Sequence, residues 1–223
     1  MRTALALSAV ALTSLAMGCA APEPDAMEGE MTVQALDVGS ASVELLVNNG
    51  APVSKSKTVT LTFVTDTPDE LAEMCVSNSP NCTNWVEFSS SMSWTMAGEG
   101  PRSVYVWLAT MDGEESTEPL VGTVTVDTTK PVDGMVTAVR AAGKVNLTWD
   151  GYMDAGTGIA KYKVVYATGG VPGSCSMGTP LYSGTVASAT HKMPTKGTTY
   201  GYRVCALDAA GNMSSGAGTL LTF

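Results

Sequence analysis

The sequence predicts an all-β protein built from two tandem antiparallel β-sandwiches. Apolar and polar residues alternate with a period of two in many short runs, as in Val59–Phe63 and Val145–Trp149, and this is the period of half-buried strands. Turn signals such as Asn49–Gly50 and Asp112–Gly113 separate the runs at a spacing typical of antiparallel sandwiches. No amphipathic helix is predicted, and Asp69–Met74 is at most one turn that leads into a strand.

The predicted strands follow one another along the chain. Clear alternation marks Val59–Phe63, Val104–Leu108, Val145–Trp149 and Tyr162–Tyr166. The turn signals are Asn49–Gly50, Asn78–Asn81, Ala97–Pro101, Asp112–Gly113, Asp150–Gly151 and Gly169–Gly170. Asp127–Pro131 is the predicted joint between the sandwiches, because a proline directly after a strand ends the pairing and keeps the chain extended.

The aromatic residues support two hydrophobic cores. All 14 lie between Phe63 and Phe223, spread over two stretches of about 100 residues each, the usual size of a sandwich with one core. We therefore expect one sandwich over residues 42–130 and a second over residues 131–223.

The N-terminal segment has the composition of an export signal. Arg2 is followed by an apolar stretch that is too short to span a membrane, so residues 1–18 are predicted to be a signal peptide. The run Leu15–Cys19 resembles the lipobox of bacterial lipoproteins, which implies that Cys19 carries lipid; the alternative is an ordinary cut near Ala20 or Ala21. Residues 19–41 then form an acidic tether, and the absence of Asp after Cys19 favours the outer membrane, on its periplasmic or cell-surface side.

Four cysteines remain once Cys19 is set aside, an even number in a compartment that permits disulfides. Three pairings are formally open. We favour Cys75–Cys82 and Cys175–Cys205, because each pair then lies within one predicted sandwich. A zinc site competes poorly, since there is no pair of cysteines at metal-binding spacing and only one histidine.

Charge and histidine content exclude several function classes. The formal net charge of -9 argues against nucleic-acid binding. It is divided unevenly, with -9 over residues 32–130 and +3 over residues 131–223. The single histidine, His191, has no nucleophile motif near it and is predicted to lie on the surface, so no catalytic residue, cofactor or metal site is assigned and the protein is predicted not to be an enzyme.

The first predicted sandwich contains a distinctive series of residues, namely Met74, Ser77, Asn78, Trp85, Trp94, Val104, Tyr105, Val106, Asp127–Thr129 and Pro131. In these residues it resembles the immunoglobulin-like repeats of large secreted bacterial surface proteins. The segment Met111–Glu115 departs from the turn found in those repeats.

The second predicted sandwich contains aromatic and turn residues in a characteristic order, namely Trp149, Tyr162, Val164, Tyr166, Tyr200, Tyr202, Val204, Ala206 and the turn Asp208–Asn212. In these residues it is similar to fibronectin type III domains, especially bacterial secreted ones. Together the two resemblances cover nearly all of the chain from Ser42 to Phe223 and imply an immunoglobulin-like sandwich followed by a fibronectin type III-like one.

Acidic residues raise two possible site types, a calcium site and a pair of catalytic carboxylates. Asp208 and Asn212 present oxygen atoms that suit calcium, but a hairpin turn capped by Asp208, with a positive φ at Gly211, explains the same residues and is the favoured interpretation. Two clusters also invite comparison with paired catalytic carboxylates, although we expect both in solvated turns. They are Asp66, Asp69, Glu70 and Glu73, and Asp112, Glu114, Glu115 and Glu118.

Two surfaces are predicted to bind a ligand. Tyr105 and Trp107 are out of phase with the apolar residues of their strand and should face outward, whereas Trp149 is in phase and should be core; Trp85 and Trp94 are expected in core or edge packing. In the second sandwich, the face expected to be mildly basic carries Lys161, Lys163 and Arg203.

These observations favour a non-catalytic, lipid-anchored cell-envelope protein that acts in adhesion, display, or protein or glycan binding. Its expected partners are the membrane, through the N-terminal lipid, and an envelope protein or polysaccharide. The alternative is a carbohydrate- or substrate-binding accessory module of a secreted hydrolase system. The cations of the basic face are explained by solubility alone; the alternative hypothesis is that this face binds an anionic cell-envelope polymer or an acidic protein.

Overall fold

The computed structural model describes residues 35–223, and this part of the chain is built of strands and the loops that join them. Within it the helical elements are two short 3-10 turns, η1 (Asn48–Gly50) and η2 (Pro68–Glu70). The all-β prediction is therefore confirmed, and η2 leads directly into β5 (Leu71–Ser77) as expected. The predicted signal peptide, Cys19 and most of the tether lie outside the described residues.

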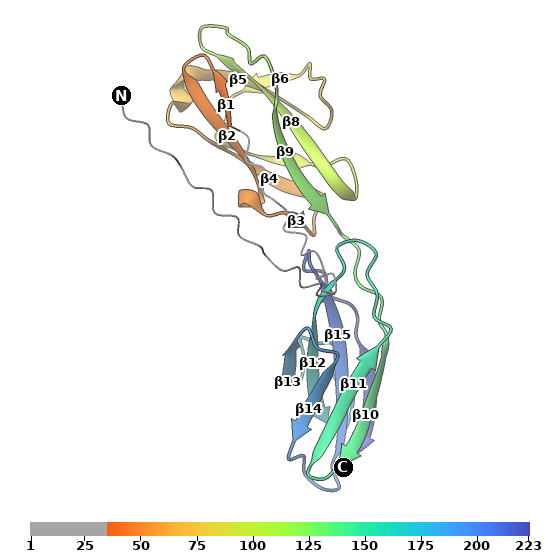
Figure 1. The fold of residues 1–223 in the computed structure, drawn as a ribbon. Helices are drawn as coiled ribbons and strands as arrows, with labels where there is room; N and C mark the ends of the chain where they lie inside the picture. Colours follow the sequence, from red (N-terminus) through yellow and green to blue (C-terminus); the bar gives the residue numbers. More distant parts are fainter. Residues whose placement is uncertain (1–34) are drawn as a thin grey trace, which may run out of the picture. The chain divides into compact units, whose positions relative to one another are not determined.

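Two sheets form the first sandwich (Figure 1). One has the order β1 (Ala35–Val38), β2 (Ala41–Val47), β4 (Thr58–Val64) and β7 (Ser91–Thr95). The other has the order β3 (Val53–Ser54), β9 (Leu120–Val126), β8 (Gly100–Thr110), β5 (Leu71–Ser77) and β6 (Trp85–Glu87). All pairings are antiparallel except the short β3–β9 pair, which is parallel.

The start of the first sheet lies earlier in the chain than the alternation indicates. β1 begins at Ala35 and pairs with β2 across a turn at Gly39, whose φ is +57°. Val38 is buried in the first core although it precedes residue 42. The alternation in β1 extends only over Leu36, Asp37 and Val38, and so short a run does not stand out from the acidic segment before it.

The first core consists of the inward residues of both sheets, as the alternation predicts. Val59, Leu61 and Phe63 of β4 face Val104 and other residues of β8 and β9 across the sandwich, and all of them belong to one buried cluster. Along β8 buried and half-buried residues alternate from position 103 to position 108. One face of each strand therefore packs into the core and the other remains accessible.

The second sandwich also has two antiparallel sheets (Figure 1). The first has the order β10 (Met135–Ala141), β11 (Lys144–Asp150) and β14 (Ser188–Lys192). The second has the order β13 (Thr179–Gly184), β12 (Ile159–Thr168), β15 (Thr199–Asp208) and β16 (Ala217–Thr222).

Aromatic side chains dominate the second core. Trp149 is 4% exposed, and its ring lies edge-on to that of Tyr162 at 5.5 Å, so its predicted core position is confirmed. The buried Tyr152 hydroxyl donates to the main-chain oxygen of Val204 at 2.8 Å, and burial raises the pKa of Tyr152 to about 12. These rings fill the space between the sheets; the Tyr152 hydroxyl has a main-chain partner, whereas Trp149 Nε1 is buried without a hydrogen-bond partner among the described residues.

The prediction that His191 lies on the surface is wrong. His191 is only 8% exposed because β14 pairs with β11 in a register that sets His191 opposite the fully buried Val145. Its ring lies 4.4 Å from that of Tyr166, and its Nδ1 lies 2.9 Å from the Tyr202 hydroxyl. Burial lowers the pKa of His191, so the ring is held as a neutral core group.

Candidate functional site

Three aromatic side chains share the outer face of the five-stranded sheet. Tyr105 and Trp107 are half-buried and point away from the core, as predicted. Trp107 lies opposite Cys75 of β5, and Cys75 in turn lies opposite Trp85 of the edge strand β6. Paired residues project from the same side of a sheet, so Trp85, Tyr105 and Trp107 form one surface, which we call the aromatic face.

A disulfide-stapled loop holds the aromatic face in place. The predicted Cys75–Cys82 disulfide is present and closes the loop between β5 and β6. Pro80 within this loop accepts a hydrogen bond from Trp107 Nε1 at 3.0 Å. The indole is therefore fixed from its edge by a main-chain oxygen, and the orientation of its ring is set before any ligand arrives.

The other end of the same loop is also anchored. The Asn78 Nδ2 donates to the main-chain oxygen of Thr95 at 3.0 Å, and Trp94 Nε1 donates to the Asn78 Oδ1 at 3.1 Å. Trp94 lies opposite Val59 and packs against the first core, as expected for core or edge packing. Trp85, by contrast, lies on the edge strand β6 and faces outward, so it is not part of the first core.

Two exposed carboxylates border the aromatic face. Glu73 of β5 lies opposite Glu87 of β6, and each is two residues away from the Cys75–Trp85 pair. Within residues 35–223 the one salt bridge joins Lys57 to Glu99, so neither Glu73 nor Glu87 is neutralised by an ion pair. The surface therefore combines flat apolar rings with negatively charged acceptors.

The predicted basic residues do come together on the outer face of the β13-β12-β15-β16 sheet. Lys163 lies opposite Cys205, and Arg203 lies opposite Val165, which places both basic residues and Lys161 on one side of the sheet. Their use in binding stays a prediction.

Arg203 has a structural role in this face. Its Nε donates to the main-chain oxygen of Pro172, and its Nη1 donates to those of Ser215 and Gly216. The predicted Cys175–Cys205 disulfide is present next to it, in a small apolar cluster with Val165. A guanidinium that already donates to three carbonyl groups has few donors left for a ligand, so the accessible cations of the face are the two lysines.

The two acidic clusters meet across one hollow in the first sandwich. Asp69 and Glu70 line it from η2, and Asp112 and Glu114 line it from the loop after β8. The hollow is open and has a volume of about 470 Å³. Sequence reasoning placed each cluster in a turn but had no signal that could bring the two turns together.

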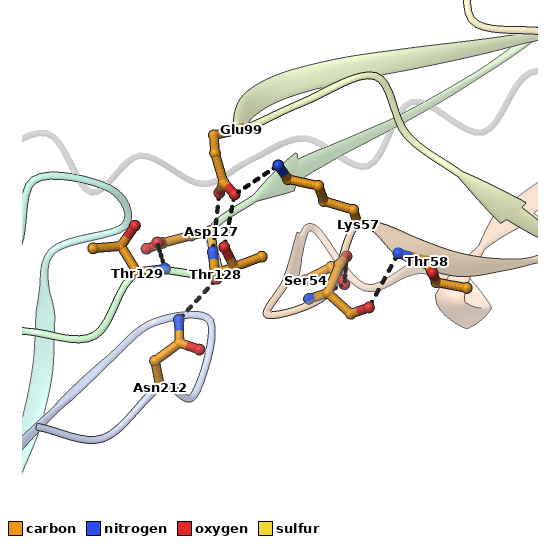
Figure 2. Close-up of polar contacts among 9 residues, drawn as sticks. Ser54, Lys57, Thr58, Glu99, Asp127, Thr128, Thr129 and Asn212 are labelled. Atoms are coloured by element: carbon orange, nitrogen blue, oxygen red, sulfur yellow. Dashed lines mark hydrogen bonds and ion pairs between the residues drawn. The ribbon is translucent and has the colours of Figure 1, made fainter.

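The Asp208–Asn212 segment forms the predicted turn. Gly211 has a φ of +91°, and Asp208 Oδ1 accepts a hydrogen bond from the main-chain nitrogen of Asn212 at 2.7 Å. After the turn, Met213 forms a bridge with Leu207, and β16 begins at Ala217. The Asn212 side-chain amide donates to Asp208 Oδ2 at 2.7 Å. It also donates to the main-chain oxygen of Asp127 at 2.7 Å (Figure 2).

Comparison with known proteins identifies the fold. No protein-family model matches the sequence, and no curated protein matches it. A crystal structure of consecutive titin domains is 16% identical with a TM-score of 0.53, and the match covers 86% of this chain and 68% of that one. The fibronectin(III)-like modules of Clostridium thermocellum CbhA are 12% identical with a TM-score of 0.49, covering 80% and 93%.

A segment of two fibronectin type III domains from chicken tenascin is 13% identical with a TM-score of 0.35, and the match covers 85% of this chain and 99% of that one. At such low identities the likeness concerns the fold alone. The chain has the fold of tandem immunoglobulin-like and fibronectin type III modules, as the residues indicate. Among residues 35–223, no helix has the length and apolar character needed to cross a membrane.

Proposed function

We propose that this protein is a non-catalytic, exported binding protein of the cell envelope that holds a neutral polysaccharide on its aromatic face. The observation that carries the proposal is the placement of Trp85, Tyr105 and Trp107 on one face of a sheet, beside Glu73 and Glu87. The two disulfides support export, because such bonds persist in oxidising compartments.

The chemistry of the face favours a sugar ligand. Aromatic rings offer flat apolar surfaces on which the C–H faces of sugar rings can stack, and they lose little conformational freedom when they bind. Carboxylates accept charge-assisted hydrogen bonds from hydroxyl groups. Glu73 and Glu87 therefore suit a hydroxyl-rich ligand and repel an anionic one.

Rigidity supports the same assignment. The indole of Trp107 is held by Pro80 within a loop closed by the Cys75–Cys82 disulfide. A preorganised surface does not lose side-chain freedom on binding, which raises the affinity of an otherwise shallow site. Such a module serves equally in adhesion to a glycan and as the accessory part of a secreted hydrolase system.

The test is binding to a panel of neutral polysaccharides, namely cellulose, amylose, xylan and mannan. The unaltered chain should bind at least one of them without releasing new reducing ends. Trp107→Ala should weaken that binding about tenfold or more, as for aromatic residues at the centre of other interfaces. Trp107→Phe, which keeps a ring but loses the bond to Pro80, should lie between the two.

Val64→Ala is the matched control, because Val64 is exposed on the other sheet of the same sandwich and its loss removes apolar surface at a distance from the rings. It should bind like the unaltered chain. Binding that survives Trp107→Ala, or a preference for anionic polygalacturonate over every neutral polymer, would contradict the proposal.

Lipid attachment at Cys19 is the second part of the proposal and rests on the lipobox-like run Leu15–Cys19. Cells grown with radiolabelled palmitate should label the unaltered chain and not the Cys19→Ser variant. Label that persists in Cys19→Ser, or that is missing from the unaltered chain, would contradict anchoring while leaving the polysaccharide test untouched.

A further inference from the structure

Three carboxylates from distant segments meet beside the second sandwich. Asp127 follows β9, Asp154 lies in the loop between β11 and β12, and Asp208 ends β15. One carboxylate oxygen from each lies within 4.8 Å of those from the other two. None of the three belongs to the aromatic face, whose rings lie on β6 and β8.

Two of these carboxylates are buried. Asp127 is 2% exposed and Asp208 is 3% exposed. The loop is shaped to admit the first of them, because a Cβ added at Gly156 would lie only 2.4 Å from the Asp127 carboxylate. A buried carboxylate is costly unless a cation or several donors compensate its charge.

Hydrogen bonds from neutral groups partly compensate the burial of these carboxylates. Asp127 Oδ1 accepts from the main-chain nitrogen of Thr129 at 3.1 Å, and its Oδ2 accepts from the main-chain nitrogen and hydroxyl of Thr157 at 2.8 and 2.7 Å. Both oxygens of Asp208 accept from Asn212. These donors are all neutral, so they orient the carboxylates without cancelling their charge.

The two carboxylate oxygens of Asp154 differ in their hydrogen bonding. Its Oδ2 accepts hydrogen bonds from the main-chain nitrogens of Gly156 and Gly158 at 3.1 and 2.8 Å. Its Oδ1 is buried from solvent and has no hydrogen-bond partner within the described part of the chain. A buried, unpaired carboxylate oxygen is rare in native structures and requires an explanation such as a bound ion.

No basic side chain in the described residues forms an ion pair with the three carboxylates. Lys57, the basic side chain labelled in Figure 2, pairs with Glu99 at 3.4 Å. The three carboxylates therefore accept hydrogen bonds from neutral donors only. Their mutual repulsion in a water-poor site favours capture of a cation.

We propose that Asp127, Asp154 and Asp208 bind one calcium ion. The ligand atoms are all carboxylate oxygens, which suit hard cations and not zinc, for which nitrogen and sulfur ligands are usual. Calcium–oxygen distances of about 2.3–2.6 Å allow oxygens up to about 5 Å apart to share one ion, and the three found here satisfy that limit. Magnesium needs near-ideal octahedral geometry and loses its water reluctantly, so a site made of three protein carboxylates suits calcium better.

The expected affinity is modest. Three protein carboxylates leave coordination positions for water, and extracellular calcium modules with few ligands have dissociation constants of about 10⁻⁴ to 10⁻³ M. Bound calcium links the 127–131 segment to the loops at positions 154 and 208. It should therefore protect that segment from proteases and raise the melting temperature of the second sandwich.

The test is thermal unfolding of the full chain after chelator treatment, with calcium or magnesium chloride as the only additive. Calcium at about 5 mM should raise the melting temperature by several degrees. This concentration exceeds the expected dissociation constants of about 10⁻⁴ to 10⁻³ M. Magnesium at the same concentration should raise the melting temperature less. Calorimetric titration should show one calcium ion per chain.

Asp154→Asn separates an ion site from a merely structural carboxylate. It should abolish the calcium shift, yet in chelator it should melt no lower than the unaltered chain, because it removes a repulsive charge and keeps an acceptor oxygen. Asp150→Asn is the matched control, since Asp150 is an exposed carboxylate at the end of β11 and outside the cluster. It should keep the full calcium shift.

Three results would overturn the proposal. One is an unaltered, chelator-treated chain whose melting temperature does not respond to calcium. Another is an Asp154→Asn variant that responds as strongly as the unaltered chain. The third is a magnesium response equal to or larger than that of calcium, which would leave the three carboxylates without the selectivity assigned to them.

Discussion

Loss of the Cys175–Cys205 disulfide should destabilise the chain more than loss of Cys75–Cys82. The first bond joins residues separated by 30 positions and the second joins residues separated by 7. A crosslink lowers the entropy of the unfolded chain more when the closed loop is longer. The perturbation is the double variant Cys175→Ala with Cys205→Ala, compared with Cys75→Ala and Cys82→Ala.

The loop lengths set the expected magnitudes. With sequence separations of 30 and 7, the loop-closure relation gives about 3.6 kcal/mol for the long loop and about 2.4 kcal/mol for the short one. Cys175 and Cys205 are also almost fully buried beside Val165. Removing their sulfur atoms leaves unfilled space and adds to the loss.

Native-state hydrogen exchange is the suitable assay, because it reports opening of each sandwich separately. Without Cys175–Cys205, amides of β15 should lose protection while those of β8 keep it; without Cys75–Cys82, the pattern should reverse and the change should be smaller. Equal losses in both strands for either variant would refute the assignment of each bond to its own core. A larger loss for the short loop would refute the entropic reasoning.

Two further predictions concern single residues of the second sandwich. Burial lowers the pKa of His191 in the folded chain, so below about pH 6.5 the unfolded chain binds a proton that the folded chain does not. The free energy of unfolding therefore decreases as the pH decreases, by up to about 1.4 kcal/mol per pH unit. His191→Gln should lose less stability than the unaltered chain between pH 7 and 5 in urea unfolding, and parallel curves would contradict this. Gly156→Ala should lower the free energy of unfolding by about 1–3 kcal/mol, because the added Cβ clashes with Asp127. Gly170→Ala, whose added Cβ meets open space, should leave it nearly unchanged. Equal effects of the two variants in thermal unfolding would rule out the close contact.

Local sequence patterns predicted the core residues, the outward position of Trp107 and the two disulfides. The alternation around Val59–Phe63 and Val145–Trp149 identified residues of both cores, because each of these strands has one buried face. The outward position of Trp107 followed from the same phase. The disulfides followed from keeping each pair within one sandwich, a rule that needs no knowledge of strand order.

Long-range register explains what the sequence did not reveal. His191 lies between Thr190 and Lys192, so its neighbours in the chain are polar and only its pairing opposite Val145 turns it inward. In the same way, Asp69 and Asp112 belong to separate turns, and only the β5–β8 pairing brings those turns to one hollow. Composition and periodicity contain no information on which strands become neighbours.

The Asp208–Asn212 turn shows how a local interpretation and a long-range one apply to the same residues. Turn chemistry needs only one Asp208 oxygen to accept from the Asn212 main chain and a positive φ at Gly211. That leaves lone pairs of the carboxylate available, since a carboxylate accepts about four bonds. The turn therefore does not exclude calcium: it fixes Asp208 close to Asp127 and Asp154, and the proposed site depends on the proximity of these two further carboxylates.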